Sequence, residues 1–521
     1  MKMIHRLANK LLDSSSSDPV FLFALSPTTK ESARSYAVVG AIGVGFLSTA
    51  WISLQRSRKL RQVAKEYTQE LSHLKNQECI PSLLLTCEDR ALYNSSTRCI
   101  YLDYNGTTPI REEVVSAMIP YLTTHFGNPS SAHYYGRQPK VAIQRARAEI
   151  ASLLLTQEQV QDKKLVEETS NAIIFTGCGT EADNMAIHLA VYAWFAGRKT
   201  NKEAGIPHVV TCNVEHPAVA ECLKFFEQRG DIETTYVKVD EEGLVSASDV
   251  IDVIRPNTCF VTLMLANNES GAIMPVLEVA SFCRKKGVLF HTDAAQAVGK
   301  LAMDLERLGG PDMITLVGHK FGAPKGVAAL YVRPGCLGKN GRKEPDLYGV
   351  SGGLLLGGGQ ETGRRAGTEN VPYIVGMGRA ASLVSGPNLV ENAAHMEQMR
   401  TKLIDNLTRE LGKENIRANG PRERERRLPN TLSVGIKNVH SGELLKRVGE
   451  QVAASAGSAC HASGGKISAV LLAMNVPIEF ANGTLRLSVG VGTSEADLDR
   501  ATEIIAREAR RQWETKSRDA Q

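Results

Sequence analysis

From residue 100 onward, short runs of β-branched and other apolar residues alternate with segments of about 10 to 25 residues that have a helical pattern. Near-continuous apolar strands separated by helices are typical of a mostly parallel sheet covered on both faces. We therefore predict an α/β fold, in which ligands bind at the carboxyl ends of the strands. The predicted strands are 172–176 (AIIFT), 208–212 (HVVTC), 259–265 (CFVTLML), 288–293 (VLFHTD) and 312–318 (DMITLVG).

The composition is that of a globular protein. The chain has 521 residues, of which 43% are hydrophobic, so it is long enough for two packed domains and an extension. Its formal charge of +5 is small for this length, so nucleic-acid binding has little support. The ten cysteines form no C-x-x-C pair and no Cys/His metal spacing. We therefore predict neither a metal site nor a disulfide framework, and a reducing compartment such as the cytosol or the mitochondrion.

The N-terminal hundred residues differ from the rest. An uncharged run of about 20 residues, 35–55 (SYAVVGAIGVGFLSTAWISLQ), has the length of a membrane-spanning helix and precedes the basic stretch RSRKLRQ. We predict a membrane anchor within an extension over 1–62, followed by a helical linker over 63–98. The alternatives are a buried helix rich in Gly and Ala, and a cleaved organelle-targeting segment that leaves a soluble or mitochondrial protein.

Several polar residues follow the predicted strands directly. After Thr176 comes GCGTEADNMAIH, in which Gly177, Gly179 and Thr180 open a helix and could cradle a phosphate, although a plain helix cap fits equally well. Two further strand ends carry Asp293 with Gln296, and His319 with Lys320. A lysine that ends a buried apolar strand is desolvated, and this lowers its pKa toward the value that Schiff-base chemistry needs.

These three features together indicate pyridoxal phosphate (PLP). The phosphate cradle would hold its phosphate, and Lys320 would form a Schiff base with its aldehyde. Asp293 would keep the pyridine nitrogen protonated, so that the ring can act as an electron sink.

From about Tyr101 to Arg507, the chain resembles the cysteine desulfurase and selenocysteine lyase family of class V aminotransferases, which have PLP fold type I. The resemblance implies a large PLP-binding domain over 111–387 with a mostly parallel seven-stranded sheet. It also implies a smaller α+β domain over 99–110 and 388–513, with a tail at 514–521. The matching motifs are YLDYNGTTP, FGNPSSAHYYGR, GTEADN, VEHPAV, NNESGAIMP, HTDAAQAVGK, GHKFGAPKG, GGGQETGRRAGTEN, GSACHAS and LRLSVG.

The resemblance implies cofactor-binding roles for individual residues. Lys320 matches the Schiff-base lysine and Asp293 the partner of the pyridine nitrogen. Gln296 matches the residue that bonds the ring hydroxyl, and His216 the imidazole that stacks on the ring. The residues that match phosphate ligands are Gly179, Thr180 and His319.

Other matches concern the substrate and a second subunit. Asn268, which also lies beside the cofactor, and Arg486 match the groups that hold the substrate carboxylate, the arginine by a bidentate fork. Thr368 matches a threonine that reaches the phosphate of the neighbouring subunit, which implies a homodimer. One match fails, because Val317 stands where the sulfur-dedicated members usually carry a phosphate-binding serine.

Cys460 lies in SAGSACHASGG, a stretch of small residues without apolar periodicity. We therefore predict an accessible loop thiol, although a buried structural cysteine is the more common case. The resemblance implies that this thiol acts on the sulfur or selenium of the substrate. His461 either aids proton transfer there or is simply solvated.

We predict PLP-dependent removal of selenium or sulfur from L-selenocysteine or L-cysteine, with L-alanine as co-product. LVGHKF and ANNESG are more similar to selenocysteine lyases, so we favour that activity. The alternative is a cysteine desulfurase that supplies sulfur to an acceptor protein for cofactor or iron–sulfur assembly. More remote are a class V aminotransferase in which Cys460 is incidental, and a non-catalytic, membrane-tethered PLP-binding protein.

Overall fold

The computed structural model describes residues 99–198, 205–337, 354–456 and 467–519. The predicted membrane anchor and linker lie outside these residues, as do Cys460 and His461. No helix within the described ranges is long and apolar enough to cross a membrane. Contacts divide the chain into Met1–Asn94 and Ser95–Gln521, and the second unit is described below.

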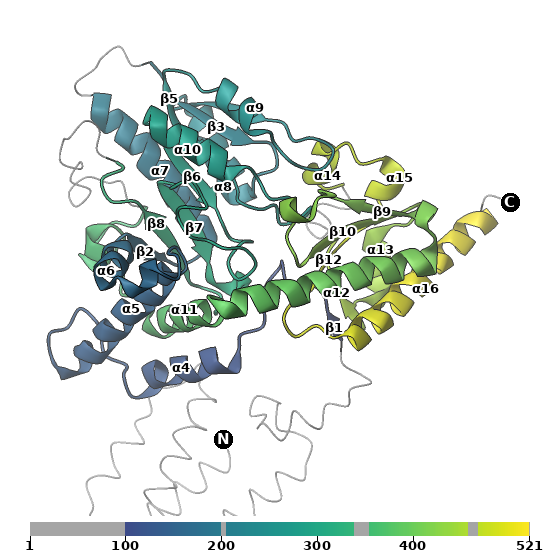
Figure 1. The fold of residues 1–521 in the computed structure, drawn as a ribbon, viewed down its shortest axis with the longest axis horizontal. Coiled ribbons are helices and arrows are strands. Elements are labelled where there is room, and N and C mark those ends of the chain that lie inside the picture. The colour runs from purple at the N-terminus through teal and green to yellow at the C-terminus, as the bar shows by residue number, and fades with distance from the viewer. Residues whose placement is uncertain (1–98, 199–204, 338–353, 457–466, 520–521) are drawn as a thin grey trace, which may run out of the picture. The chain divides into compact units, whose positions relative to one another are not determined.

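The central sheet of this unit has seven strands in the order β2-β8-β7-β6-β5-β3-β4 (Figure 1). Strand β8 is antiparallel to both of its neighbours, and every other neighbouring pair is parallel. The predicted α/β fold with a mostly parallel seven-stranded sheet is therefore confirmed. The strands are β2 (Ile173–Thr176), β3 (His208–Cys212), β4 (Glu233–Val237), β5 (Thr258–Thr262), β6 (Leu289–Asp293), β7 (Met313–Val317) and β8 (Ala328–Val332).

The two faces of this sheet lie in different hydrophobic cores. In β2, Ile173 and Phe175 belong to one core, which they share with residues of α5, α10 and α11, whereas Ile174 belongs to another core with residues of α7 and α8. Successive side chains of a strand point to opposite faces, so a strand that is apolar throughout requires a cover on both. The continuous apolar runs in the sequence have this cause.

The described residues contain thirteen α-helices, which range from four to 25 residues in length. They are α4 (Glu112–Thr123), α5 (Tyr134–Ser152), α6 (Lys163–Asn171), α7 (Gly179–Arg198), α8 (Pro217–Gln228), α9 (Ala247–Asp252), α10 (Val276–Lys286), α11 (Val371–Leu383), α12 (Pro387–Leu411), α13 (Ser441–Val448), α14 (Ala469–Ala473), α15 (Ile478–Ala481) and α16 (Glu495–Asp519).

A second, antiparallel sheet has the order β12-β10-β9 and packs with the long helices α12 and α16 (Figure 1). Its core takes Ile100 and Leu102 from the start of the described chain, and its other residues come from the segment between Met396 and Ala509. This segment pattern agrees with the predicted smaller domain, whose boundaries remain a prediction. The strands outside the central sheet are β1 (Ile100–Tyr101), β9 (Ile416–Asn419), β10 (Thr431–Ile436), β11 (Val452–Ala453) and β12 (Thr484–Ser488).

Candidate active site

The predicted site residues follow strands of the central sheet. Helix α7 begins with Gly179 directly after β2, and His216 follows β3 as the N-cap of α8. Asp293 is the last residue of β6, and Lys320 ends the short 3₁₀ helix η4 (Gly318–Lys320) after β7. Because these strands are parallel, their carboxyl ends share one edge of the sheet, where ligands of such folds bind.

The Lys320 side chain is largely buried and bound to backbone. Its Nζ donates to the carbonyl oxygens of Asn105 (2.7 Å) and Gly106 (2.9 Å). Burial, and then the positive charge of Arg486, lower its pKa to about 8, while Asp293 and Asp103 oppose that shift. A substantial fraction of this amine is therefore neutral near physiological pH, as a nucleophilic lysine requires.

Asp293 and His216 lie within electrostatic reach of each other and of Lys320. Asp293 is buried, which raises its pKa, while the Ala295 N–H (2.8 Å), His216 and Lys320 oppose this. His216 Nδ1 accepts the Ala218 N–H (3.1 Å), so the neutral ring carries its proton on Nε2. Burial lowers the pKa of His216, which favours that neutral ring. A buried carboxyl of this kind suits a protonated ring nitrogen.

Gln296 is held from both ends of its amide. Its Nε2 donates to the Asn105 carbonyl (3.1 Å), and its Oε1 accepts from Lys300 Nζ (3.1 Å). Lys300 is buried, and this burial lowers its pKa to about 7. The two contacts leave the Gln296 amide with a defined orientation.

The predicted phosphate cradle has an ion pair at its base. Glu181, in the first turn of α7, accepts the Gly177 N–H (2.7 Å) and pairs with Arg365 (2.8 Å). A Cβ on Gly179 would lie 2.6 Å from Cγ2 of Val317, so a glycine is required there. Thr180 is exposed at the helix N-terminus.

The remaining predicted residues within the described ranges are His319, the pair Arg486 and Asn268, and Thr368. His319 Nδ1 bonds Thr107 Oγ1 (3.1 Å), and burial lowers the pKa of His319 to about 4. Arg486 Nη1 reaches the backbone oxygen of Asn268 (3.4 Å), which brings the two predicted carboxylate ligands together. Thr368 is exposed.

Comparisons with known proteins agree on one family. Residues 100–501 match the model of the aminotransferase class-V family. The cysteine desulfurase IscS of Dictyoglomus turgidum is 39% identical over 413 residues, which cover 79% of this chain and 94% of that protein. A cysteine desulfurase of Trichormus azollae is 39% identical over 412 residues, covering 78% and 92%. The chain belongs to the cysteine desulfurase family of class V aminotransferases.

Solved structures lead to the same family. A NifS-like protein superposes with a TM-score of 0.65 at 31% identity, covering 79% of this chain and 99% of that one. A structure of SspA in complex with cysteine has a TM-score of 0.59 at 30% identity, covering 76% and 99%. The predicted resemblance and the assignment as an enzyme of this family are thus confirmed.

This cysteine desulfurase family member uses PLP as its cofactor, and the residues at the strand ends fit that group. Lys320 supplies an amine of lowered pKa and Asp293 a buried carboxyl. The N-terminus of α7 has backbone N–H groups of the kind that would bind a phosphate. The predicted preference for selenocysteine is not confirmed, because the relatives named above are cysteine desulfurases and so favour the alternative reading.

The sequence predicted no role for three residues that the structure places in this site. Asp103 pairs with Arg486 (2.8 Å), and Asn105 accepts hydrogen bonds from both Lys320 and Gln296. Lys300 bonds Gln296. All three lie inside motifs that carry the resemblance, YLDYNGTTP and HTDAAQAVGK, so their membership in these motifs was the available signal.

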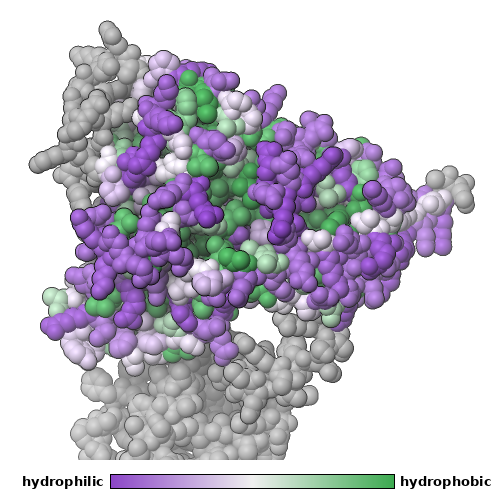
Figure 2. Space-filling model, viewed as in Figure 1, coloured by the Kyte–Doolittle hydropathy of each residue, from purple (hydrophilic) through white to green (hydrophobic). Residues whose placement is uncertain are grey.

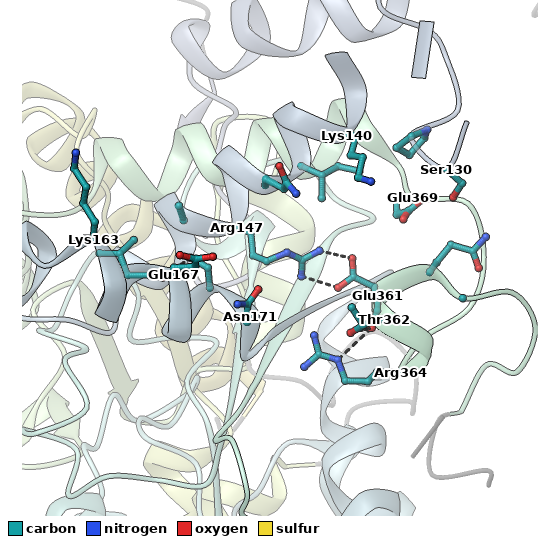
Figure 3. Close-up of a pocket in the computed structure, with 18 of the residues that line it drawn as sticks. Ser130, Lys140, Arg147, Lys163, Glu167, Asn171, Glu361, Thr362, Arg364 and Glu369 are labelled. Carbon is teal, nitrogen blue, oxygen red and sulfur yellow. Dashed lines mark hydrogen bonds and ion pairs between the residues drawn. The ribbon is translucent and has the colours of Figure 1, made fainter. Parts of the chain in front are cut away.

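A cavity of about 1350 Å³ lies apart from these residues, between α5, α6 and the loop around η5 (Gln360–Gly363) (Figure 3). No predicted site residue within the described ranges lines it. Arg147 of α5 and Glu361 of η5 form a bidentate ion pair there, with Nη2–Oε1 at 2.6 Å and Nη1–Oε2 at 2.7 Å. Glu361 also accepts the Phe175 N–H (3.0 Å), so this carboxylate satisfies a backbone donor of β2, the edge strand of the sheet.

Proposed function

We propose that the protein removes sulfur from L-cysteine, giving L-alanine and a persulfide on its own Cys460. The observation that carries this proposal is the agreement of relatives called cysteine desulfurase with the gathering of Lys320, Asp293 and His216 at the carboxyl ends of the parallel strands. The structure of SspA with cysteine, similar over 76% of this chain, supports the same substrate. Selenocysteine is the second candidate substrate, and the departure at Val317 favours it.

Arg486 and Asn268 bind the substrate carboxylate. The N–H groups of the Arg486 guanidinium form a fork that matches the two carboxylate oxygens. The Arg486 side chain is 9% exposed, so this charge pair would form in a largely desolvated place, where it is strong. The carboxylate thereby fixes the Cα atom of the substrate relative to Lys320.

Lys320 moves the proton at Cα. Bound PLP would supply an electron sink for Cα, and the buried Asp293 carboxyl would keep its ring nitrogen protonated. The lowered pKa of Lys320, about 8, suits an amine that takes and returns a proton near neutral pH. His216 would pack against the ring of the cofactor, and Gln296 would donate to its hydroxyl.

The Cys460 thiolate attacks the sulfur of the substrate. An S–S bond forms, the Cβ–S bond breaks, and its electron pair remains on the substrate carbon, which is then protonated on the way to L-alanine. The described residues that flank the thiol stretch are fixed close to this site. Ser455 forms a β-bridge with Arg486, and Ser468 donates to Glu269 (2.5 Å), the neighbour of Asn268.

The protein acts as a homodimer, in which Thr368 reaches the phosphate of the neighbouring subunit. Thr368 is exposed, as this role requires. Val115, Ile119 and Leu122 form an exposed apolar face on α4, and Phe126 beyond it is exposed as well. Figure 2 shows hydrophobic residues at the surface among a mostly hydrophilic cover. Large exposed apolar patches mark interaction sites.

The persulfide sulfur is passed to an acceptor protein. The apolar run at 35–55 tethers the enzyme to a membrane, with the catalytic unit in a reducing compartment. The domain boundaries at 99–110, 111–387 and 388–513 are part of the same proposal.

The deciding experiment measures L-alanine release in parallel from L-cysteine and L-selenocysteine, with protein-bound persulfide detected by alkylation and mass spectrometry. We expect release from cysteine together with a persulfide on Cys460. Release from selenocysteine alone would assign the protein to the lyases. Release from neither substrate by PLP-loaded protein would refute the proposed function.

A further inference from the structure

The turn from Asp103 to Gly106 lies between the two cationic side chains of the site. The carbonyl oxygens of Asn105 and Gly106 accept hydrogen bonds from Lys320 Nζ (2.7 and 2.9 Å). Oδ1 of Asp103 accepts from Nη2 of Arg486 (2.8 Å). One short turn therefore holds both the lysine and the arginine.

Local backbone structure explains why the Asp103 carboxylate lies there. Asp103 forms a parallel β-bridge with Ser488, two residues beyond Arg486 on β12. The carboxylate occupies the space that a Cβ of Gly106 would need, so a glycine at that position lets it approach the turn. The Gly106 N–H in turn donates to the Asp103 carbonyl (2.9 Å).

The ion pair leaves the arginine able to bind a second carboxylate. Nη1 makes one long contact, 3.4 Å, to the Asn268 oxygen, and Nε has no hydrogen-bond partner among the described residues. A guanidinium has five N–H donors, so several remain for a substrate. The Asp103 side chain is 28% exposed and the Arg486 side chain 9%, so the pair is only partly screened by water.

We propose that Asp103 is a positioning residue that fixes the orientation of Arg486 and sets the charge that Lys320 experiences. The inference rests on the proposed roles of Arg486 and Lys320. The carboxylate of Asp103 opposes the field of Arg486 at Lys320, and both charges act on the lysine. It also opposes an incoming substrate carboxylate, which brings a second negative charge to the same guanidinium.

Asp103→Asn separates the orientation of Arg486 from the negative charge of Asp103, because the amide keeps an oxygen acceptor for Arg486 but loses the charge. The first readout is the pH midpoint of the visible absorption of PLP-loaded protein, which reports the Schiff base at Lys320. Loss of a nearby negative charge should lower this midpoint by about half a pH unit or more. The second readout is the dissociation constant of 3-mercaptopropionate, a carboxylate without an amino group, measured by calorimetry. It should fall by about threefold or more, because less repulsion opposes the ligand.

Two further variants complete the design. Asp499→Asn removes a carboxylate from α16, where Asp499 accepts from Asn406 (2.8 Å), and it should leave both readouts unchanged. Asp103→Glu retains the charge, so its midpoint should stay at the wild-type value, and it tests the proposal even if the asparagine variant does not bind PLP.

An unchanged midpoint or an unchanged dissociation constant in Asp103→Asn would overturn the proposal, and so would a midpoint shift of half a unit in Asp103→Glu. Neither readout involves sulfur transfer. Failure of the proposed desulfurase reaction would therefore appear separately, as absence of alanine release from wild-type protein.

Discussion

Replacing Glu361 by glutamine should destabilise the protein by about 2–3 kcal/mol. The Glu361 side chain is 2% exposed and accepts three hydrogen bonds, two from Arg147 and one from the Phe175 N–H. Removing one partner of a buried ion pair costs about 3–5 kcal/mol, because the other charge stays buried. Arg147 would retain the Ile173 carbonyl (2.6 Å) and its packing on the Phe175 ring (4.8 Å), which lowers the expected loss to about 2–3 kcal/mol, at or below the lower end of that range.

The backbone of residue 361 does not change this value. Glu361 has φ of 50° and Thr362 has φ of 56°, so the loop is held in the left-handed region at two successive residues that are not glycine. Glutamine at position 361 would have the same backbone strain as glutamate, so the strain cancels in the difference in free energy of unfolding. The bonds from Arg147 and Phe175 are thus what the substitution measures.

The assay is urea unfolding of PLP-loaded protein, followed by fluorescence, in a double-mutant cycle with Arg147→Met. Because the two side chains contact each other, the double variant should lose about 1–3 kcal/mol less than the sum of the two single variants. Glu168→Gln, which breaks the exposed pair with Lys164 (3.7 Å), is the matched control and should cost less than about 0.5 kcal/mol. A loss below about 0.5 kcal/mol in Glu361→Gln, or simple additivity in the cycle, would refute the reasoning.

Four further predictions concern the proposed reaction and the N-terminus. Lys320→Ala should abolish alanine release while the dimer stays folded, as judged by light scattering, and appreciable turnover would remove Lys320 from the mechanism. The rate at which PLP loads the apoprotein should rise as the pH passes through about 8, because only the neutral Lys320 amine attacks the aldehyde; a pH-independent rate would contradict this. Cys460→Ala should lose far more alanine release from cysteine than from selenocysteine, since the selenol is the better leaving group, and equal losses would count against an obligatory thiol. A protein that starts near Ser95 should remain active and leave the membrane fraction, whereas full-length, uncleaved protein found wholly in the soluble fraction would argue against an anchor.

The sheet was predictable from the sequence where its strands are buried on both faces. β2, β3, β5, β6 and β7 lie within or close to the predicted apolar runs. β4 was missed because it is the last strand in the sheet order and carries partly exposed polar residues (ETTYV), so it lacks the apolar signal. β8 was missed although all five of its residues are buried, because the short run AALYV follows closely on β7 with no α-helix between the two strands.

The residues that follow these strands were predictable for the same reason, since parallel strands bring their carboxyl ends together. Contacts between distant segments were not. Asp103 and Arg486 are 383 positions apart, and no local pattern in either segment indicates that a turn after β1 meets β12. The pairing depends on the parallel bridge between Asp103 and Ser488, which is a property of the folded backbone. Motif membership could mark Asp103 as a residue of interest, but its contact with Arg486 could come only from the structure.

Gly179 and Val317 are distant in the sequence but adjacent in the structure. The sequence suggested that Gly179 lets a phosphate approach and that Val317 removes a phosphate ligand, as two independent features. In the structure a Cβ on residue 179 would lie 2.6 Å from a Val317 methyl group, so the valine itself demands the glycine. A serine at position 317 would present one methyl-sized branch fewer, and would both relax this demand and restore a hydrogen-bond donor. Val317 therefore closes the space beside Gly179 at the end of β7, a contact that neither motif reveals alone.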